Sequence, residues 1–383
     1  MSGNNDAEQA LRGRKKTAAL AVRILLGVVF LFSGLIKLND PMGLAFKIEE
    51  YFSPGVFNMQ FLAPLATEFA VALITLELIL GASLLMGRFK VFTLWTLLVL
   101  NSGFTIVTFY SALTGKVSDC GCFGDAVHME PWPSFFKNVA LTAMIILLIV
   151  WQRFIKPTAR FRTAMSVVAG IFAISLGTAY YVFHNEPFVD LRPYKAGVNI
   201  PDAMKVPDDA EKPVYENTWV YSVDGVEKEY TDADEPWDIP GAQFVSRTTR
   251  LVKKGFEPEI TGFSIETGDG RDVTDSILSL ERVFVIVSYD IASSSPKKWE
   301  KINAKAAAAK NPVIVLANST DDKYADMYGI KIPVYFADPV TLKTIIRSNP
   351  GVVELRRGTV EGKWSYINIR YGKEEKFRML KLA

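Results

Sequence analysis

The chain has 383 residues, which is enough for about two domains or a little more. Charged residues make up 22% and hydrophobic residues 49% of the chain, and this balance excludes a disordered polypeptide. The net charge of +2 provides no concentrated basic surface, which excludes a nucleic-acid-binding protein. Two cysteines exclude a disulfide-rich scaffold and a four-cysteine zinc module. The mean hydropathy of +0.17 indicates a very apolar part joined to an ordinary one.

Five apolar runs in the first half are near the length that crosses the hydrocarbon core of a bilayer. They cover residues 18–38, 62–86, 91–113, 135–151 and 163–183. We therefore expect five membrane-spanning helices, with residues 1–17 as an N-terminal tail and residues 18–184 as the membrane domain.

The Lys and Arg residues outside these runs fall in alternate connections. They lie in the N-terminal tail, in the turn at 87–90 and in the hinge at 152–162, whereas the connections 39–61 and 115–134 are mostly acidic. Positive charge is enriched on the cytoplasmic side of membrane proteins. The sequence therefore predicts a cytoplasmic N-terminus and, after five spans, a C-terminal half outside the cytoplasm.

Charged residues inside the spans are costly in hydrocarbon and need partners. We expect Glu77 of the second span to pair with Arg23 of the first. Glu68 lies nearer the outer surface, where Lys37 or water would satisfy it. Two interpretations stay open. The charges form structural ion pairs within the bundle, or they form a site for protons or a quinone.

The C-terminal half has a different pattern. Residues 185–259 read as a proline-rich tether followed by a hairpin with an Asp224-Gly225 turn. Residues 260–383 alternate buried strands with helices. The expected strands are 283–287, 313–316, 334–336, 352–356 and 360–366, and the expected helices are 297–310 and 322–328. The predicted fold class is a membrane all-α helical bundle followed by an α/β domain.

Residues 18–152 resemble the bacterial DoxX/MauE-type membrane family. The matching residues are Arg23, Gly27, Ser33-Gly34-Leu35-Ile36-Lys37, Asn39-Asp40-Pro41, Glu77-Leu78-Ile79-Leu80-Gly81, Cys120-Gly121-Cys122-Phe123-Gly124 and Lys137-Asn138. The resemblance implies a helical bundle in the bacterial inner membrane, with the C-terminal domain in the periplasm. MauE-like proteins are linked to the maturation of a disulfide-rich periplasmic enzyme subunit, and other relatives to quinone or sulfur chemistry.

Residues 260–366 look like a thioredoxin fold. The family's active-site dithiol would follow the strand that ends at Tyr289, where this chain has Ser293-Ser294-Ser295-Pro296. Asn349-Pro350 matches the position of the family's cis-proline. Without cysteines this domain cannot exchange dithiols, so the resemblance implies a binding module whose groove beside Asn349 and Pro350 holds an extended protein partner.

Cys120 and Cys122 lie in one short loop with Gly121 between them, and glycine permits the tight turn that a bridge between them needs. Three interpretations stay open. The pair is redox-active, with Lys137 and a helix that begins near Ser134 stabilising a thiolate; it is a structural bridge; or it binds a metal together with His128, although a fourth ligand is not evident.

The leading hypothesis is a membrane component of periplasmic thiol/disulfide or quinone-linked redox handling, with Cys120 and Cys122 as the catalytic pair. Its enzyme class would be a component of a thiol-disulfide oxidoreductase. The cofactor is not identified by the sequence. A quinone is the candidate left open, and no metal is predicted. The alternative is a non-enzymatic envelope assembly or scaffold subunit. In both cases the expected partners are the lipid bilayer and a periplasmic or membrane protein.

Overall fold

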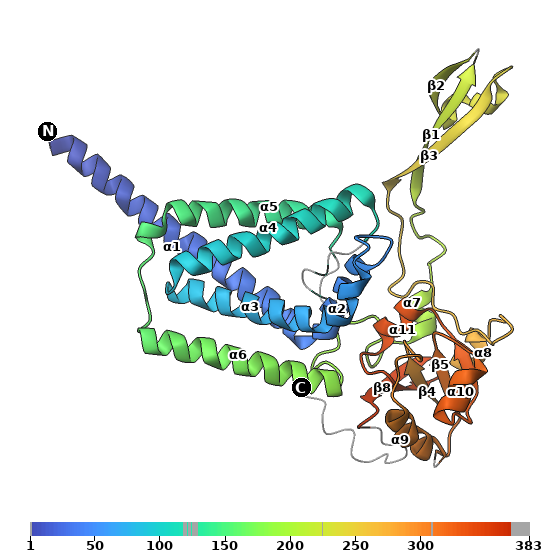
Figure 1. Cartoon of the computed structure of the whole chain (residues 1–383). Coiled ribbons are helices and arrows are strands. Elements are labelled where there is room, and N and C mark those ends of the chain that lie inside the picture. Colours follow the sequence, from blue (N-terminus) through green and yellow to red (C-terminus); the bar gives the residue numbers. More distant parts are fainter. Residues whose placement is uncertain are drawn as a thin grey trace.

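The computed structural model describes residues 2–117, 121, 124, 129–223, 225–307 and 309–368. In these residues the chain forms a helical bundle, an α/β domain at one end of the bundle, and a small sheet that projects away from the α/β domain (Figure 1). The N-terminus lies at the opposite end of the bundle.

Among the described residues, five helices are long and apolar enough to cross a membrane, and this number agrees with the sequence prediction. They are α1 (Ser2–Asn39), α3 (Ala66–Met86), α4 (Lys90–Thr114), α5 (Pro131–Val150) and α6 (Phe161–His184). The short 3-10 turns η1 (Gln60–Leu65) and η3 (Gln152–Phe154) precede α3 and follow α5. Large apolar side chains such as Phe32, Phe92 and Ile106 face outward on these helices, as expected of a surface that contacts lipid.

Helices α1, α3, α4 and α5 share one apolar core. Its fully buried members include Leu26, Leu80, Leu97 and Ile145, one from each helix. Helix α6 packs against α3 at the edge of this four-helix arrangement. The tertiary contacts thus make α1 and α3 central and α6 peripheral.

Glycines set the distance between α1 and α3. A Cβ on Gly81 would lie 3.1 Å from the carbonyl oxygen of Gly27, and a Cβ on Gly34 would lie 2.8 Å from the side chain of Leu78. Small residues allow helix backbones to approach closely in membranes. Gly27 and Gly34 of α1 therefore face α3.

The connection 39–61 contains a helix that its sequence composition does not predict. Helix α2 (Pro41–Phe52) begins after Asp40, whose carboxylate accepts a hydrogen bond from the backbone N–H of Gly43. A side-chain N-cap followed by proline at the first helical position is a strong start signal. Pro54, Gly55 and Asn58, which are turn-forming residues, lie further along the same connection and give it the composition of a loop.

The α/β domain is built on a five-stranded sheet with the order β6-β5-β4-β7-β8. Its strands are β4 (Val283–Ser288), β5 (Val313–Ala317), β6 (Val334–Phe336), β7 (Gly351–Arg356) and β8 (Thr359–Ser365). The first three are parallel, and β7 and β8 form an antiparallel pair next to β4. The expected strands are all present, and β4 is buried along its whole length.

Helices cover both faces of this sheet. Helices α9 (Pro296–Ala307) and α10 (Asp322–Tyr328) supply Trp299 and Tyr328 to one core. Helices α7 (Ile200–Met204), α8 (Thr274–Leu278) and α11 (Pro339–Ile345) contribute to the core on the other face. The Asn349–Pro350 peptide bond directly before β7 is cis.

The predicted tether differs from the structure in its middle. Tyr194 and Ile200 are buried in the α/β core, and the backbone of Ile200 donates to the carbonyl oxygen of Gly358. This segment therefore belongs to the domain rather than leading to it. Prolines at both ends gave it the composition of an extended linker, which hides the apolar side chains between them.

The projecting sheet contains the predicted hairpin and a third strand. Strands β1 (Val214–Val223) and β2 (Val226–Thr231) pair antiparallel with Val223 opposite Val226, and Asp224 of the turn lies outside the described residues. Strand β3 (Gln243–Lys253) pairs with the other edge of β1 after the 3-10 turns η4 (Asp232–Asp234) and η5 (Pro236–Asp238). Every residue of β3 is exposed, and this third strand was not foreseen.

A buried charge network anchors the start of the segment that follows α6. Arg192 pairs with Glu186 at 2.8 Å and with Asp190 at 2.7 Å, and Asp190 also pairs with Lys363 of β8. Burial opposes ionisation of Asp190, but Arg192 and Lys363 outweigh it and lower its pKa to about 2. Burial, together with Arg192, lowers the pKa of Lys363 to about 8 although Asp190 opposes this shift.

We expect the ion pairs of Asp190 to make the free energy of unfolding depend on pH at acidic values. The folded-state pKa lies below the ordinary value of 3.8. The pair therefore contributes about 2 kcal/mol above about pH 4, and this is lost as the pH falls to about 2. Asp190→Asn should lower the unfolding midpoint of the α/β domain at neutral pH, read from the fluorescence of buried Trp299. The difference from the unmodified chain should vanish near pH 2, whereas Asp202→Asn, which changes an exposed side chain of α7, should leave the profile unchanged.

Candidate functional site

The loop that carries the predicted cysteine pair is described only at its glycines. Cys120 and Cys122 lie outside the described residues, as does His128, so their roles remain predictions. Gly121 is buried with φ of 63°, and a Cβ there would lie 3.1 Å from Cγ of Lys47 on α2. Gly124, also at positive φ, lies beside Ile36 near the end of α1. Of this segment, Gly121 thus lies against α2 and Gly124 lies near the end of α1.

The intramembrane charges pair differently from the sequence prediction. Lys37 Nζ lies 2.8 Å from the Glu77 carboxylate, and both side chains are buried. Arg23 instead donates from Nη1 to the carbonyl oxygen of Lys156 at 3.0 Å. The predicted Arg23–Glu77 pair is therefore wrong. Glu68 is exposed in the first turn of α3, where the positive end of the helix favours a carboxylate.

The register of the α1–α3 crossing explains this correction. The helices are antiparallel, with Gly27 opposite Gly81 and Gly34 opposite Leu78, so Glu77 lies opposite α1 near Ser33. Lys37 is one helical turn from that level. Arg23 is about ten residues away, which corresponds to about 15 Å along a helix. The side chain of Arg23 is too short to cover that distance.

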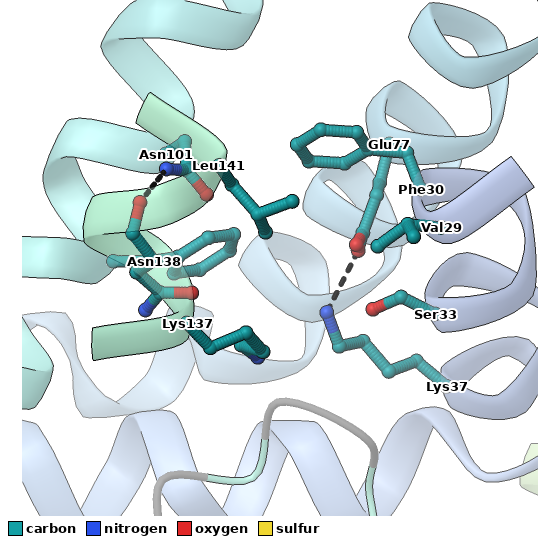
Figure 2. Close-up of a pocket in the computed structure, with 10 residues that line it drawn as sticks. Val29, Phe30, Ser33, Lys37, Glu77, Asn101, Lys137, Asn138 and Leu141 are labelled. Carbon is teal, nitrogen blue, oxygen red and sulfur yellow. Dashed lines mark hydrogen bonds and ion pairs between the residues drawn. The ribbon is translucent and has the colours of Figure 1, made fainter. Parts of the chain in front are cut away.

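Lys37 and Glu77 line a polar pocket inside the four-helix bundle (Figure 2). The space among its lining atoms is about 310 Å³ and is partly open to solvent. Its other lining residues are Val29, Phe30, Ser33, Asn101, Phe104, Lys137, Asn138 and Leu141. Figure 2 shows polar side chains from α1 and α3 on one side and from α4 and α5 on the other. The pocket is thus polar in a part of the chain that is otherwise apolar.

Asn101 is the polar residue of this pocket that the sequence analysis missed. Its Nδ2 donates to the carbonyl oxygen of Asn138 at 2.8 Å and to the hydroxyl of Thr142 at 2.7 Å. An asparagine within an apolar run between helices indicates an interhelical hydrogen bond. That signal was present in the sequence, and the hydrogen bonds tie α4 to α5 on one side of the pocket.

The start of α5 lies slightly before the predicted position. The helix begins at Pro131 with Glu130 at its N-cap, so Ser134 is not the cap. Ser134 is instead fully buried within the first turns. Lys137 and Asn138 remain near the helix start and line the pocket, so the positive end of α5 and Lys137 lie on the side of the Cys loop.

The residues predicted to form a partner groove are bound within the chain. Pro350 is buried, and Asn349 accepts from the hydroxyl of Ser288 at 2.8 Å and donates to the carbonyl oxygen of Asp290 at 2.7 Å. The adjacent Arg347 forms an ion pair with Asp40 at 2.7 Å. The groove side of the domain therefore faces the chain's own membrane part, and the sequence offered no sign of this long-range contact.

Helix α2 carries most of this contact. The ring of Phe46 meets that of Tyr289 edge to face at 5.3 Å between centroids, and Glu49 pairs with Lys343 at 2.8 Å. Burial opposes ionisation of Asp40, but the adjacent guanidinium of Arg347 outweighs it and holds the pKa of Asp40 below its ordinary value. Burial raises the pKa of Tyr289 above its ordinary value. One helix thus contacts both Gly121, through Lys47, and the α/β domain.

The Lys37–Glu77 pair allows the structural and functional interpretations to be separated. Glu77→Gln leaves a buried lysine without its carboxylate and should lower stability by about 3–5 kcal/mol. Replacing both charges, as Lys37→Met with Glu77→Met, should recover most of this loss. Thermal unfolding in detergent measures both effects. Glu50→Gln breaks the more exposed pair with Lys47 and should cost about 1 kcal/mol at most.

The double variant then decides the role of the pair. If it folds and the cysteines still cycle between oxidised and reduced forms in cells, the pair is structural. Loss of that cycling in a folded double variant would assign the charges to the chemistry. A double variant as unstable as Glu77→Gln would contradict the buried ion pair itself.

Comparisons with known proteins agree with a membrane location. Residues 15–152 match the family described as methylamine utilisation protein MauE. The chain is 29% identical over 161 residues to Protein TlpB of Flavobacterium psychrophilum, which covers 39% of this chain and 40% of that protein. The matched part is thus less than half of that relative's length. No solved structure matches the chain. With its five apolar helices, this is a multi-pass membrane protein whose segment 15–152 is similar to the MauE family.

Proposed function

We propose that this protein takes part in thiol/disulfide redox handling at the outer face of the bacterial inner membrane, with Cys120 and Cys122 as the exchanging pair. The observation that carries the proposal is the position of Gly121, which lies between the two cysteines and packs against Lys47 of α2. Gly121 thus lies against α2, the helix that also contacts the α/β domain, and Gly124 lies beside Ile36, next to Lys37 of the polar pocket.

The distribution of charge supports this orientation. The N-terminal tail, the α3–α4 turn and the α5–α6 hinge carry the basic residues, and they lie at the bundle end opposite the α/β domain (Figure 1). Basic loops mark the cytoplasmic side. The Cys loop and the α/β domain are then in the periplasm, where thiols can be oxidised.

The sheet of the C-terminal domain supports a thioredoxin-like fold. Three parallel strands in the order β6-β5-β4 are followed by an antiparallel pair, and Pro350 precedes the strand that pairs with β4. In place of the dithiol are serines, of which Ser294 accepts a hydrogen bond from the indole of Trp299. Such a domain binds rather than exchanges disulfides. Its proposed role is to hold α2, and with it the Cys loop, in place.

The proposed chemistry is a balanced exchange. A client thiolate attacks the Cys120–Cys122 disulfide, and a second client thiolate resolves the mixed disulfide. The client leaves with a disulfide, and the loop is left as a dithiol. Two electrons and two protons of this dithiol then pass to a quinone in the membrane, which restores the loop disulfide.

The polar pocket has the composition that a quinone site needs. Ligand pockets combine apolar walls with a few polar groups that fix orientation. Phe30, Phe104 and Leu141 provide the walls, while Lys37 and Lys137 provide donors for a carbonyl oxygen. The free space among these side chains is about that of a water molecule, so they would have to move apart to bind and orient the acceptor.

A scaffold function is the second candidate. The observation that favours it is the projecting sheet, where Trp237 and Phe244 remain about half exposed on the side that packs against Trp219. Exposed aromatic side chains are typical of protein-binding surfaces. In that case the Cys loop is a structural bridge and the sheet holds an envelope protein.

The redox state of the cysteines in intact cells separates the two functions. We expect a mixed population of oxidised and reduced Cys120 and Cys122 when thiols are trapped with a mass-tagging alkylator, because an exchanging pair cycles. Cells depleted of quinone should accumulate the dithiol form. Cys120→Ala or Cys122→Ala should capture a mixed disulfide with a client, and the double Ser variant provides the control.

A pair that is fully oxidised in every strain, with or without quinone, would contradict exchange and leave the scaffold function. Labelling of the reduced cysteines only after cell lysis, by a reagent that cannot cross the inner membrane, would contradict the orientation.

A further inference from the structure

A second pocket lies at the bundle end that carries the N-terminus, far from the Cys loop. The space among its lining atoms, between α1 and the hinge that follows α5, is about 430 Å³ and is partly open to solvent. Its lining residues are Lys16, Ala19, Leu20, Arg23, Phe154, Ile155, Lys156 and Thr158. Three of these residues are cations and four are apolar. No acidic residue is among them.

Arg23 is the buried cation of this pocket. Its side chain is about 5% exposed, and Nη1 donates to the carbonyl oxygen of Lys156 at 3.0 Å. Nε is buried without a hydrogen-bond partner among the described residues. No described carboxylate pairs with this guanidinium, so its charge is compensated only by a backbone dipole.

The backbone is arranged to keep Arg23 in this position. Gly87 ends α3 with φ of 63°, and a Cβ there would lie 2.6 Å from Nη1 of Arg23 and 2.5 Å from the carbonyl oxygen of Lys156. Any larger residue would displace the guanidinium. The close approach of three segments thus holds a buried, uncompensated cation at the edge of the bundle.

The surrounding sequence supplies no counter-charge. Residues 9–39, 86–118 and 150–184 contain no Asp or Glu. Neighbouring cations at this end, Arg88 and Lys90, likewise donate to backbone carbonyl oxygens of residues 159 and 152. A buried charge in a membrane protein requires compensation. An anion from outside the chain would provide it.

We propose that this pocket binds a phosphate group, supplied by the headgroup of an anionic membrane lipid. Arginine matches phosphate oxygens with paired N–H donors, and basic pockets between membrane helices bind anionic headgroups. Lys16 and Lys156, two exposed lining residues, add positive charge that would attract a free phosphate and a lipid phosphate alike. The apolar wall of Leu20 and Phe154 favours the lipid, because an acyl chain buries against it.

The test uses the full chain, stripped of lipid in a neutral detergent. Short-chain phosphatidylglycerol, short-chain phosphatidylcholine and sodium phosphate are titrated separately, and ligand binding is followed by native mass spectrometry and by the unfolding midpoint. Lys16→Gln with Lys156→Gln removes two lining charges that are exposed, so folding is retained even where Arg23→Gln does not fold. Arg14→Gln with Arg162→Gln removes two exposed charges on the same side that do not line the pocket.

We expect phosphatidylglycerol to bind the unmodified chain and the Arg14/Arg162 control equally, and the Lys16/Lys156 variant about tenfold more weakly. Phosphatidylcholine and sodium phosphate should bind more weakly than phosphatidylglycerol. Equal binding by phosphate and phosphatidylglycerol would overturn the lipid as the source. Equal loss in both double variants, or in neither, would overturn the pocket. None of these readouts involves a cysteine, so the result is independent of the redox proposal.

Discussion

The ion pair between Asp40 and Arg347 joins the two halves of this protein. The Asp40 carboxylate also caps α2, so a single buried group fixes the end of α1, the start of α2 and the groove side of the α/β domain. Glu186 adds hydrogen bonds to the backbone N–H groups of Arg347 and Ser348. Removal of either ionic partner would leave a buried charge uncompensated. The contact between the α/β domain and α2 depends on this pair.

The sequence predicts the fold well where one physical pattern dominates. Spans of apolar residues, and the continuous apolar run at 283–287, identify the membrane helices and β4, because hydrophobicity of the right length leaves few alternatives. It fails where long-range packing decides. Tyr194 and Ile200 are core residues within a proline-rich segment, and β3 depends on pairing with β1 rather than on a buried face.

The site shows the same division. The residue types at Arg23, Lys37 and Glu77 correctly identified buried intramembrane charges, but the choice of partner required the helix register. That register follows from the close approach of Gly27 to Gly81. The sequence contains both glycines but does not show that they pack against each other. The contact between α2 and the α/β domain was not predictable, because Phe46 and Tyr289 are more than two hundred residues apart.

The two ends of the bundle use charge in opposite ways. At the domain end, Lys37, Arg192 and Arg347 each pair with a carboxylate of the chain, which fixes geometry at the cost of desolvating both ions. At the N-terminal end, Arg23 and its neighbours rely on backbone carbonyl oxygens, which orient a cation without cancelling its charge. A cancelled charge positions protein against protein, whereas a retained charge attracts anions. The bundle therefore presents a fixed surface to its own domain and an attractive one to the membrane interface at its other end.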